Sequence, residues 1–532
     1  MPSPSKTDDP GSVELGAAML RPDCYPHPVQ RVDCIETHIS QVFLTGSLAY
    51  KIKKRVDLGF LNFTTLEARR HFCSEELRLN RRTAPDLYLD VVPITATPSG
   101  IRVAGSGAVI DYAVRMRQFA QEALFDHMAR TGALEPQHVD SAAGVIARFH
   151  AGVSRARPET DFGAPGRVLA PVVQNFDQLE ALLSGAAEAA AVRQLREWSW
   201  KEYDCLFPAF ESRRSNGFVR ECHGDLHLGN IAFINGQPVP FDCIEFNEDF
   251  RWIDTMNEVG FVAMDLIDHG LPGYASRFVN RYLEITGDYA GMKVLRFYET
   301  YRSLVRAKVS RMRERQPHAG AEAQQQAHLE YERRLALAGR LSSESRRGLV
   351  LMHGFSGSGK TTLSQSMVET LPAVRLRSDV ERKRLHGLDA LARTGSPVAG
   401  GIYAAGASER TYARLASLAR EVMDSGNIAV IDGTFLLRRQ RDMFRKLAIE
   451  TASPFVIASC RVEEEVLRER VKRRERAATD ASEAGLAILA HQFGTHEPLA
   501  EEELPHTVVI GPGDSLQPGS ALLIELSRRL GD

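Results

Sequence analysis

The stretch RECHGDLHLGNIAF gathers several residues that could do chemistry. Cys222, His223, Asp225 and His227 lie within six positions, and Asn230 follows them. Thiol and imidazole groups at this density point to zinc, but a structural zinc site usually takes four converging ligands. No C-x-x-C or H-x-x-x-H partner follows, and adjacent residues of an extended chain point to opposite sides. Zinc is therefore the weaker interpretation, and the alternative is a site built on Asp225 and Asn230.

An aspartate followed five residues later by an asparagine fits phosphoryl transfer. Protein kinases carry H-R-D-x-x-x-x-N, in which the aspartate accepts the proton of the acceptor hydroxyl and the asparagine binds Mg²⁺. Here His223, Asp225 and Asn230 keep that spacing, with Gly224 in place of the arginine. The strands IAFI and PVPFDCIEF then flank an Asn-Gly pair, which is a strong hairpin signal. Because the hairpin returns Asp242 to Asn230, we predict both as metal ligands and Asp225 as the catalytic acid–base group.

A site of this kind also needs a lysine on an upstream strand and a glutamate on a helix to hold it. The segment AYKIKK supplies Lys51, with Ala49 in the A-x-K relation, and Lys53 lies on the same face of the strand. Downstream, FCSEELRLN offers Glu75 and Glu76 on a helical stretch. We predict that Lys51 and Glu75 orient the nucleotide, with Lys53 and Glu76 as the alternatives.

A second nucleotide motif lies in the C-terminal part of the chain. GFSGSGKTT fits G-x-x-x-x-G-K-[ST], in which glycines let backbone N–H groups surround phosphate oxygens. An apolar strand, GLVLMHG, precedes it and a helical pattern follows, as this loop requires. Lys360 is also expected to act in catalysis, and the Thr361 hydroxyl to bind Mg²⁺. The predicted nucleotide-binding residues are Gly354, Ser356, Gly357, Ser358, Gly359, Lys360, Thr361 and Thr362.

Three further positions indicate what happens to the phosphate. Asp379 ends a predicted strand at the carboxyl edge of the sheet, where ligands gather, so it can act as a base or a substrate ligand. Asp432 ends the next predicted strand and can hold Mg²⁺ as a Walker B acid does. Arg470 and Arg474 lie one helical turn apart, and we predict that Arg474 closes over the phosphoryl group. A solvated basic face is the alternative for this helix.

The overall composition indicates the class of protein in which these motifs occur. A chain of 532 residues is too long for one ordinary core, and 43% hydrophobic with 25% charged residues is typical of a globular protein. A net charge of −2 gives no sign of a nucleic-acid or membrane partner, and no apolar run reaches the roughly 20 residues of a membrane span. Seven scattered cysteines and a start without signal-peptide features indicate a reduced, cytoplasmic protein.

Changes in the residue pattern divide the chain. Residues 1–30 begin with a run rich in Pro, Ser and Asp and are predicted to be disordered or poorly ordered. Residues 31–312 carry strands and then helices, and residues 313–347, rich in Arg, Glu and Gln, indicate an exposed helical linker. Residues 348–532 alternate strands with helices, which is typical of a parallel α/β domain.

Two family resemblances follow from these motifs. HGDLHLGN followed by FDCIEFN resembles the aminoglycoside phosphotransferase family and its choline- and fructosamine-kinase-like relatives, over roughly residues 35–311. The region after about residue 349 resembles small P-loop kinases, including gluconate-kinase-like, polynucleotide-kinase and zeta-toxin-like enzymes. The whole chain resembles bacterial proteins described as bifunctional aminoglycoside phosphotransferase/ATP-binding proteins. The resemblance implies an α+β protein-kinase-like N-terminal domain and an α/β P-loop NTPase C-terminal domain with a parallel sheet.

The combined expectation is an ATP- and Mg²⁺-dependent kinase with two phosphotransfer centres, each acting on a hydroxyl of a small-molecule acceptor. In one alternative, one domain binds nucleotide only to regulate the other. In another, the P-loop domain phosphorylates nucleic-acid ends, although the sequence shows no aromatic-basic groove for them. Neither the acceptors nor the oligomeric state can be read from the sequence.

Two features depart from the family pattern. No G-x-G-x-x-G precedes Lys51, so the loop that covers the phosphates is not identified. The acids Glu245, Glu248 and Asp249 could attract a cationic substrate, or they could form a solvated acidic loop.

Overall fold

The computed structural model describes residues 10–59, 61–98, 100–316, 320–343, 345–371, 373–395, 400–477 and 482–531. The chain forms two compact units. The first unit comprises Met1–Pro171 with Phe210–Val262, and the second comprises Val172–Ala209 with Ala263–Asp532. The helical residues 263–312, predicted to complete the first domain, thus cluster with the C-terminal part.

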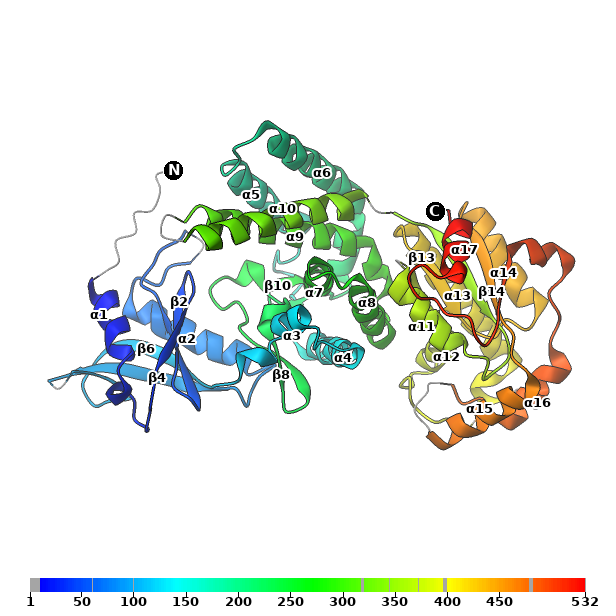
Figure 1. The fold of residues 1–532 in the computed structure, drawn as a ribbon, viewed down its shortest axis with the longest axis horizontal. Helices are drawn as coiled ribbons and strands as arrows, with labels where there is room; N and C mark the ends of the chain where they lie inside the picture. The colour runs from blue at the N-terminus through cyan, green and yellow to red at the C-terminus, as the bar shows by residue number, and fades with distance from the viewer. Residues whose placement is uncertain are drawn as a thin grey trace. The chain divides into compact units, whose positions relative to one another are not determined.

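A six-stranded antiparallel sheet forms the N-terminal part of the first unit (Figure 1). Its strands pair in the order β1-β2-β3-β6-β4-β5. The bounds of β1 to β6 are Asp33–Glu36, Ser40–Leu44, Leu48–Lys53, Tyr88–Thr97, Gly100–Val103 and Ala108–Arg117. Helix α2, Leu66–Asn80, packs against β4 and β6, and its N-terminus is capped by the Thr65 side chain, which accepts from the Ala68 N–H at 3.1 Å. The side of α2 that is turned toward β3 carries the residue that pairs with the lysines of that strand.

The start of the chain differs from the prediction of disorder over residues 1–30. Helix α1, Pro10–Met19, is followed by a short 3₁₀ turn, and Leu15, Met19 and Tyr25 are buried against the apolar face of the sheet. These side chains remove apolar strand surface from water, which stabilises the ordered segment. Residues 1–9 lie outside the described residues.

Residues 222–230 of the first unit, here called the HGD loop after His223-Gly224-Asp225, connect two small strand pairs. Strands β7, Val219–Glu221, and β10, Trp252–Asp254, pair antiparallel, and so do β8, Ile231–Ile234, and β9, Gln237–Pro240. The turn between β8 and β9 is formed by Asn235 and Gly236, both with positive φ, at 51° and 79°. The predicted Asn-Gly hairpin is therefore confirmed.

The predicted linker belongs to a packed helical layer of the second unit. Helices α8, α9 and α10 span Pro272–Thr286, Met292–Glu314 and Ala321–Ser343. Helix α10 packs against α9 (Figure 1), and its residues Tyr331 and Leu337 are buried. The segment is helical as predicted, but it is not an exposed linker because one apolar face is covered.

A five-stranded parallel sheet forms the rest of the second unit, in the order β12-β13-β11-β14-β15. The bounds of β11 to β15 are Gly348–His353, Ala373–Arg377, Ile428–Asp432, Phe455–Cys460 and Thr507–Ile510. Helices α11, α13, α14 and α17 contact these strands (Figure 1). The predicted parallel α/β fold is confirmed, and the short strand β15 is an addition that the sequence pattern had not indicated.

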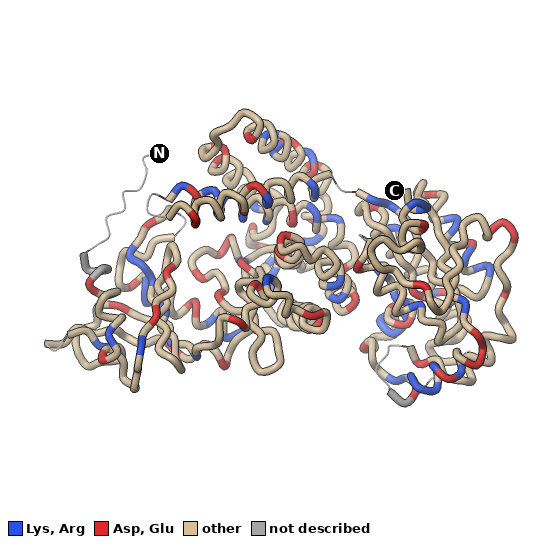
Figure 2. The backbone as a smooth tube through the Cα atoms, viewed as in Figure 1, with Lys and Arg blue, Asp and Glu red and all other residues tan. Residues whose placement is uncertain are grey.

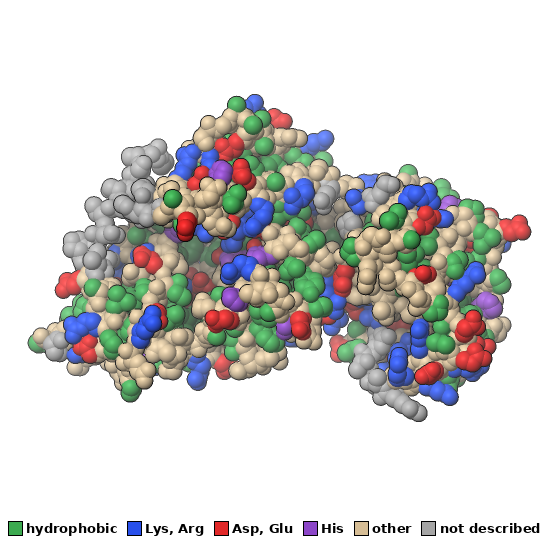
Figure 3. Space-filling view, viewed as in Figure 1, with side chains coloured by type: hydrophobic (Ala, Val, Ile, Leu, Met, Phe, Trp, Pro, Cys, Tyr) green, Lys and Arg blue, Asp and Glu red, His purple; other side chains and the backbone are tan. Residues whose placement is uncertain are grey.

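The remaining helices lie between these elements along the chain. They are α3 (Phe125–Thr131), α4 (Pro136–Gly152), α5 (Pro165–Glu180), α6 (Ala186–Ser215), α7 (Thr255–Asp268), α11 (Lys360–Thr370), α12 (Ser378–Leu385), α13 (Ala405–Asp424), α14 (Arg438–Glu450), α15 (Glu464–Ala477), α16 (Leu486–Thr495) and α17 (Ala521–Arg529). Within the described ranges, no helix combines the length and apolar character that crossing a membrane requires. Basic and acidic residues are interspersed along the chain (Figure 2), and the face drawn in Figure 3 shows both signs mixed.

Candidate active sites

Two lysines of β3 converge on one glutamate of α2. Lys51 Nζ lies 2.8 Å from Glu76 Oε1 and also pairs with Asp242. Lys53 pairs with the other oxygen of Glu76 and with Glu245. Burial of the Glu76 carboxyl opposes its ionisation, but Lys51 and Lys53 outweigh burial and lower its pKa to about 2. The cluster therefore holds fixed charges in a desolvated setting.

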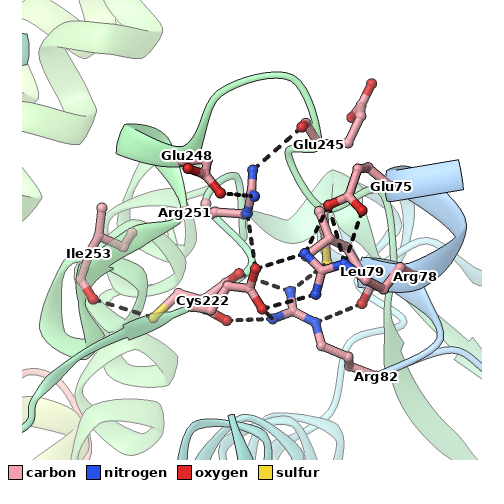
Figure 4. Close-up of polar contacts among 12 residues, drawn as sticks. Glu75, Arg78, Leu79, Arg82, Cys222, Glu245, Glu248, Arg251 and Ile253 are labelled. Atoms are coloured by element: carbon pink, nitrogen blue, oxygen red, sulfur yellow. Dashed lines mark hydrogen bonds and ion pairs between the residues drawn. The ribbon is translucent and has the colours of Figure 1, made fainter. Parts of the chain in front are cut away.

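Glu75, the predicted partner of Lys51, lies outside this cluster. Successive helix residues point about 100° apart, so Glu75 and Glu76 leave α2 in different directions. Glu75 accepts from Arg78 at 2.9 Å, and Arg78 also donates to Glu221 at 2.8 Å (Figure 4). The prediction of Glu75 is corrected to Glu76, which is fully buried and reaches both lysines.

Asp225 and Asn230 lie in the loop between β7 and β8. Asn230 Nδ2 donates to the backbone oxygen of Asp225 at 2.9 Å and to its Oδ2 at 3.3 Å. The Asp225 side chain is 43% exposed, so its carboxylate is open to an arriving hydroxyl group. The Phe241 N–H donates to the Asn230 carbonyl at 3.0 Å, which sets Asp242 beside this loop. The structure thus brings together the three residues that the hairpin was expected to assemble.

Asp242 has an unusual backbone for a residue with a side chain. Its φ is +66°, in the left-handed region that glycine favours, and its N–H donates to the Tyr88 hydroxyl at 3.2 Å. Its side chain is 41% exposed, and Oδ1 pairs with Lys51. The carboxylate of Asp242 and the amide oxygen of Asn230 are hard oxygen donors, which fit Mg²⁺.

The histidine of the HGD motif supports the loop from behind. His223 is fully buried, and its Nε2–H donates to the Phe241 carbonyl at 2.7 Å. Burial disfavours its charged form, but Cys243, Glu258 and the Phe241 carbonyl outweigh burial and raise the pKa of His223 to about 9. His223 therefore ties the start of the loop to the segment that carries Asp242.

The residues of the zinc hypothesis diverge. Cys222 Sγ lies 3.5 Å from the Ile253 carbonyl, whereas His223 bonds to the Phe241 carbonyl. His227 Nε2 lies 3.6 Å from Asp225 Oδ2, and its Nδ1 accepts from a backbone N–H within the loop. Cys222, His223 and His227 thus have three different surroundings, which a shared metal ion does not fit.

Where side chains are described, His150, Cys222 and Glu258 form the one group of potential metal ligands that lies together, within 4.8 Å. All three are buried. Glu258 already accepts from His150 Nε2 at 2.8 Å and from the Gly224 N–H. These bonds use both carboxylate oxygens, so the group fixes the HGD loop through Gly224 without a metal ion.

The acidic loop after Asp242 is paired rather than open. Glu245 is buried against Lys53, and Glu248 accepts from Arg251 at 2.9 Å (Figure 4). Asp249 pairs with Arg167 at 3.0 Å. Each acid has a cationic partner within the first unit, and Glu245 is buried, whereas the Glu248 and Asp249 side chains are 64% and 48% exposed.

The second site is a cavity of about 770 Å³ in the second unit, at the carboxyl edge of the parallel sheet. The predicted residues that line it are Ser356, Gly357, Ser358, Gly359, Lys360, Thr361, Thr362, Asp379, Asp432 and Arg474. Gly354 begins the loop with φ +140°, where a Cβ would lie 2.8 Å from the Cys460 carbonyl. Glycine is therefore required there by geometry.

Lys360 lies at the first position of α11, beneath the loop. Its Nζ donates to the Phe355 carbonyl at 2.7 Å, and burial lowers the pKa of its ammonium group. Asp432 ends β13, and its Oδ2 accepts from the Ser364 hydroxyl at 3.3 Å. The Thr361 hydroxyl and the Asp432 carboxylate are again hard oxygen donors, so both fit Mg²⁺.

Asp379 lies in the first turn of α12, directly after β12. Sequence reasoning missed three neighbours that line the same cavity, Arg382, Tyr403 and Tyr412. The Arg382 guanidinium stacks over the Tyr403 ring at 4.8 Å. A signal for Arg382 was present, because a residue three positions after Asp379 shares its helix face.

The arginines of α15 lie on the cavity wall, not on a solvated face alone. Arg470, Arg473 and Arg474 all line the cavity. Arg470 Nη1 lies 3.4 Å from the Gly357 carbonyl of the loop, and Arg474 donates to the Ala484 carbonyl at 2.6 Å. Arg470 thus contacts the phosphate-binding loop, whereas Arg474 lines the same cavity and is held by Ala484.

Two family profiles match the chain. Residues 96–298 match the phosphotransferase enzyme family, and residues 349–499 match an AAA domain. The matched region contains Asp225, Asn230 and Asp242, and the AAA match contains the phosphate-binding loop. The protein is accordingly a phosphotransferase with a second, P-loop region.

Relatives match most of the length of the chain. Uncharacterized proteins of Mycobacterium bovis and Mycobacterium tuberculosis are 29% identical over 477 residues, covering 88% of this chain and 92% of theirs.

Two solved kinase structures each cover a share of the chain. An amicoumacin kinase in complex with AMP-PNP is 12% identical, with 63% of this chain and 93% of that chain covered and a TM-score of 0.39. An APS kinase of Mycobacterium tuberculosis is 18% identical, with 35% and 99% covered and a TM-score of 0.25.

Helix α8, which lies within the phosphotransferase match, contacts the edge strand β12 of the P-loop sheet. The Asn280 side chain donates to the Ala373 carbonyl at 2.9 Å and accepts from the Arg375 N–H at 2.7 Å. These two hydrogen bonds take the place of the backbone hydrogen bonds that a neighbouring strand would form with β12.

The next turn of α8 adds a charged contact. Glu284 is buried and accepts from Arg375 at 3.2 Å and from Arg377 at 2.9 Å. Arg377 Nε in turn lies 3.8 Å from Asp432 Oδ2. A helix of the phosphotransferase region is thereby connected to a predicted metal ligand of the P-loop site.

Proposed function

We propose that the protein transfers the γ-phosphoryl group of ATP at two centres, each to a hydroxyl of a small-molecule acceptor and each with Mg²⁺. The observation that carries this proposal is the convergence of Asp225, Asn230 and Asp242 with the Lys51–Glu76 pair in the first unit. These are the parts that phosphoryl transfer requires, and they come from segments far apart in the sequence.

In the first centre, Asp225 accepts the proton of the acceptor hydroxyl as it attacks the phosphate. Lys51 orients the phosphates, and Glu76 holds its ammonium group in place. Asn230 and Asp242 would hold Mg²⁺. When bound, Mg²⁺ neutralises the charge that develops on the phosphate oxygens.

In the second centre, backbone N–H groups of the loop and Lys360 bind the phosphates, while Thr361 and Asp432 would hold Mg²⁺. Asp379 accepts the proton or positions the acceptor, and Arg474 stabilises the charge of the transferring group. The cationic lining supplied by Arg382, whose guanidinium lies over the Tyr403 ring, favours an acceptor that carries a negative charge of its own.

The test is ATP consumption by the full chain against a panel of sugars, aminoglycosides, choline-like amines, nucleosides and oligonucleotide ends. We expect Asp225→Ala to abolish turnover of one set of acceptors and Lys360→Ala to abolish turnover of another. If neither change altered the turnover of a true acceptor, the two-centre proposal would fail. Nucleotide binding by both centres with transfer by only one would make the other a regulatory module.

A further inference from the structure

Lys53 is a second buried lysine that the mechanism above does not use. It is 2% exposed, its ammonium group pairs with Glu76 and Glu245, and it lies 5.4 Å from the centre of the Phe63 ring. Lys51, two residues earlier on the same strand face, pairs with Glu76 and Asp242. Through Glu76 the two lysines form one charged cluster, and each reaches one end of the segment 242–245.

That segment has a backbone conformation that needs support. A non-glycine residue with φ near +66°, as Asp242 has, costs about 1 kcal/mol or more and persists only where its surroundings hold it. Before Asp242, Phe241 is bonded to the HGD loop at 3.0 Å. After it, the Cys243 N–H donates to Asn80 Oδ1 at 2.9 Å and the Ile244 N–H to the His223 carbonyl at 3.0 Å. These bonds fix the chain on both sides of Asp242.

The end of the segment is held by Glu245. Its carboxylate pairs with Lys53, and its carbonyl accepts from Arg251 Nη1 at 3.4 Å (Figure 4). Arg251 is buried and is itself anchored by Glu221 at 3.3 Å and Glu248 at 2.9 Å. Glu245 is 5% exposed, so it is not offered to a ligand, and its side chain serves the contact with Lys53.

A buried ion pair is weak evidence for stability, because desolvation offsets most of the attraction between the charges. Its stronger effect is to fix geometry, since only one arrangement satisfies both charges. Here that arrangement ties the strand that carries the nucleotide-orienting lysine to the segment that carries a metal ligand.

We propose that Lys53 is a positioning residue of the first centre, which acts through Glu245 to hold segment 242–245 so that the Asp242 carboxylate is preset for Mg²⁺. This inference rests on the proposed function of that centre. Both side chains of the pair are buried away from an arriving acceptor or nucleotide, so the expected effect is on metal affinity. Residues that orient metal ligands typically contribute about 10- to 100-fold in affinity.

The test uses the full chain with Lys360→Ala, which removes binding at the second centre. Mn²⁺ affinity is measured by calorimetry with a non-hydrolysable ATP analogue, and hydrogen exchange of peptides that cover residues 241–246 is measured without metal. We expect Lys53→Met and Glu245→Gln each to weaken Mn²⁺ binding about tenfold and to speed exchange in these peptides. The double variant should be no worse than Lys53→Met alone, because Lys53→Met already removes the pair with Glu245.

The matched control is Lys54→Met, since Lys54 is the next residue and pairs with the exposed Glu36. It should leave Mn²⁺ affinity and exchange unchanged. If Lys53→Met does not fold, the exchanged pair Lys53→Glu with Glu245→Lys replaces it, and recovery of affinity relative to Lys53→Glu alone supports the proposal. Variants that lower the unfolding midpoint while Mn²⁺ affinity and exchange at 241–246 stay unchanged would overturn it.

If the proposed function is wrong, the same experiment gives a different result. In that case the Lys360→Ala protein binds no Mn²⁺ with nucleotide even with Lys53 intact. Exchange at 241–246 then still decides whether Lys53 holds the segment, because that measurement contains no metal and no nucleotide.

Discussion

Lys51 Nζ lies 2.8 Å from Glu76 Oε1, whereas Glu75, one residue earlier, faces the surface arginine Arg78. Two adjacent glutamates of one helix thus have different surroundings. We expect Glu76→Gln to destabilise the first unit by about 3 kcal/mol, because it removes the negative charge that two buried lysines share. The same change should reduce turnover that depends on Asp225. Glu75→Gln is the matched control and should change stability by no more than about 0.5 kcal/mol. Urea unfolding followed by circular dichroism, with ATP turnover alongside, measures both, and equal effects of the two changes would contradict the assignment.

The same carboxylate predicts a pH dependence. The pKa of Glu76 is lowered from 4.5 to about 2 because the two lysines outweigh burial. A lowered pKa means that the unfolded chain takes up the proton first, so the stabilisation is present above pH 4.5 and is lost as the pH falls toward 2. We expect the stability difference between the wild type and Glu76→Gln to shrink across that window in urea unfolding at stepped pH. A difference that stays constant from about pH 5 to about pH 2 would show that Glu76 is not held ionised.

Arg474 lines the P-loop cavity and is expected to act on the transition state rather than on bound nucleotide. Arg474→Ala should reduce kcat of the second centre by about 10²- to 10³-fold with little change in nucleotide affinity, because the charge it stabilises develops during transfer. Arg468→Ala is the control on the same helix, since Arg468 pairs with the exposed Glu464. Steady-state kinetics with a known acceptor, and nucleotide titration, separate the two effects. Loss of nucleotide binding without loss of kcat would assign Arg474 to binding instead.

Asn280 makes two hydrogen bonds to the backbone of β12. Asn280→Ala leaves the Ala373 carbonyl and the Arg375 N–H without these partners, so we expect a loss of about 1–3 kcal/mol in the stability of the second unit. Asn427→Ala is the control in the same unit, because the Asn427 side chain donates to Ser425 within its own turn. Unfolding in urea reports the loss, and a neutral Asn280→Ala would mean that water replaces the amide at this strand.

The sequence located the loop and two acids of the P-loop cavity because local patterns set their positions, whereas Arg382, Tyr403 and Tyr412 were missed. The loop from Gly354 to Thr362 is one continuous stretch, and Asp379 and Asp432 follow strands that must end at the same edge of a parallel sheet. The hairpin that returns Asp242 to Asn230 was likewise encoded by a short Asn-Gly turn.

The choice between Glu75 and Glu76 could not be made in the same way. It depends on which face of α2 turns toward β3, and both faces of that helix carry polar residues. Lys53 and Glu245 are separated by 192 positions, and no local sequence pattern predicts their contact. The partner of Asp249 was hidden for the same reason, since Arg167 is distant from it in sequence.

The amide of Asn280 has a consequence for how this chain can be divided. Strand β12 is the edge of the P-loop sheet, and an edge with unpaired N–H and C=O groups invites other chains to add a strand. A fragment that begins after α8 would uncover that edge and should aggregate or pair with itself, even though it contains the whole phosphate-binding loop. By covering β12, helix α8 prevents another chain from adding a strand at this edge. A shortened form of the protein should therefore start before Pro272, so that this edge of the P-loop sheet stays covered.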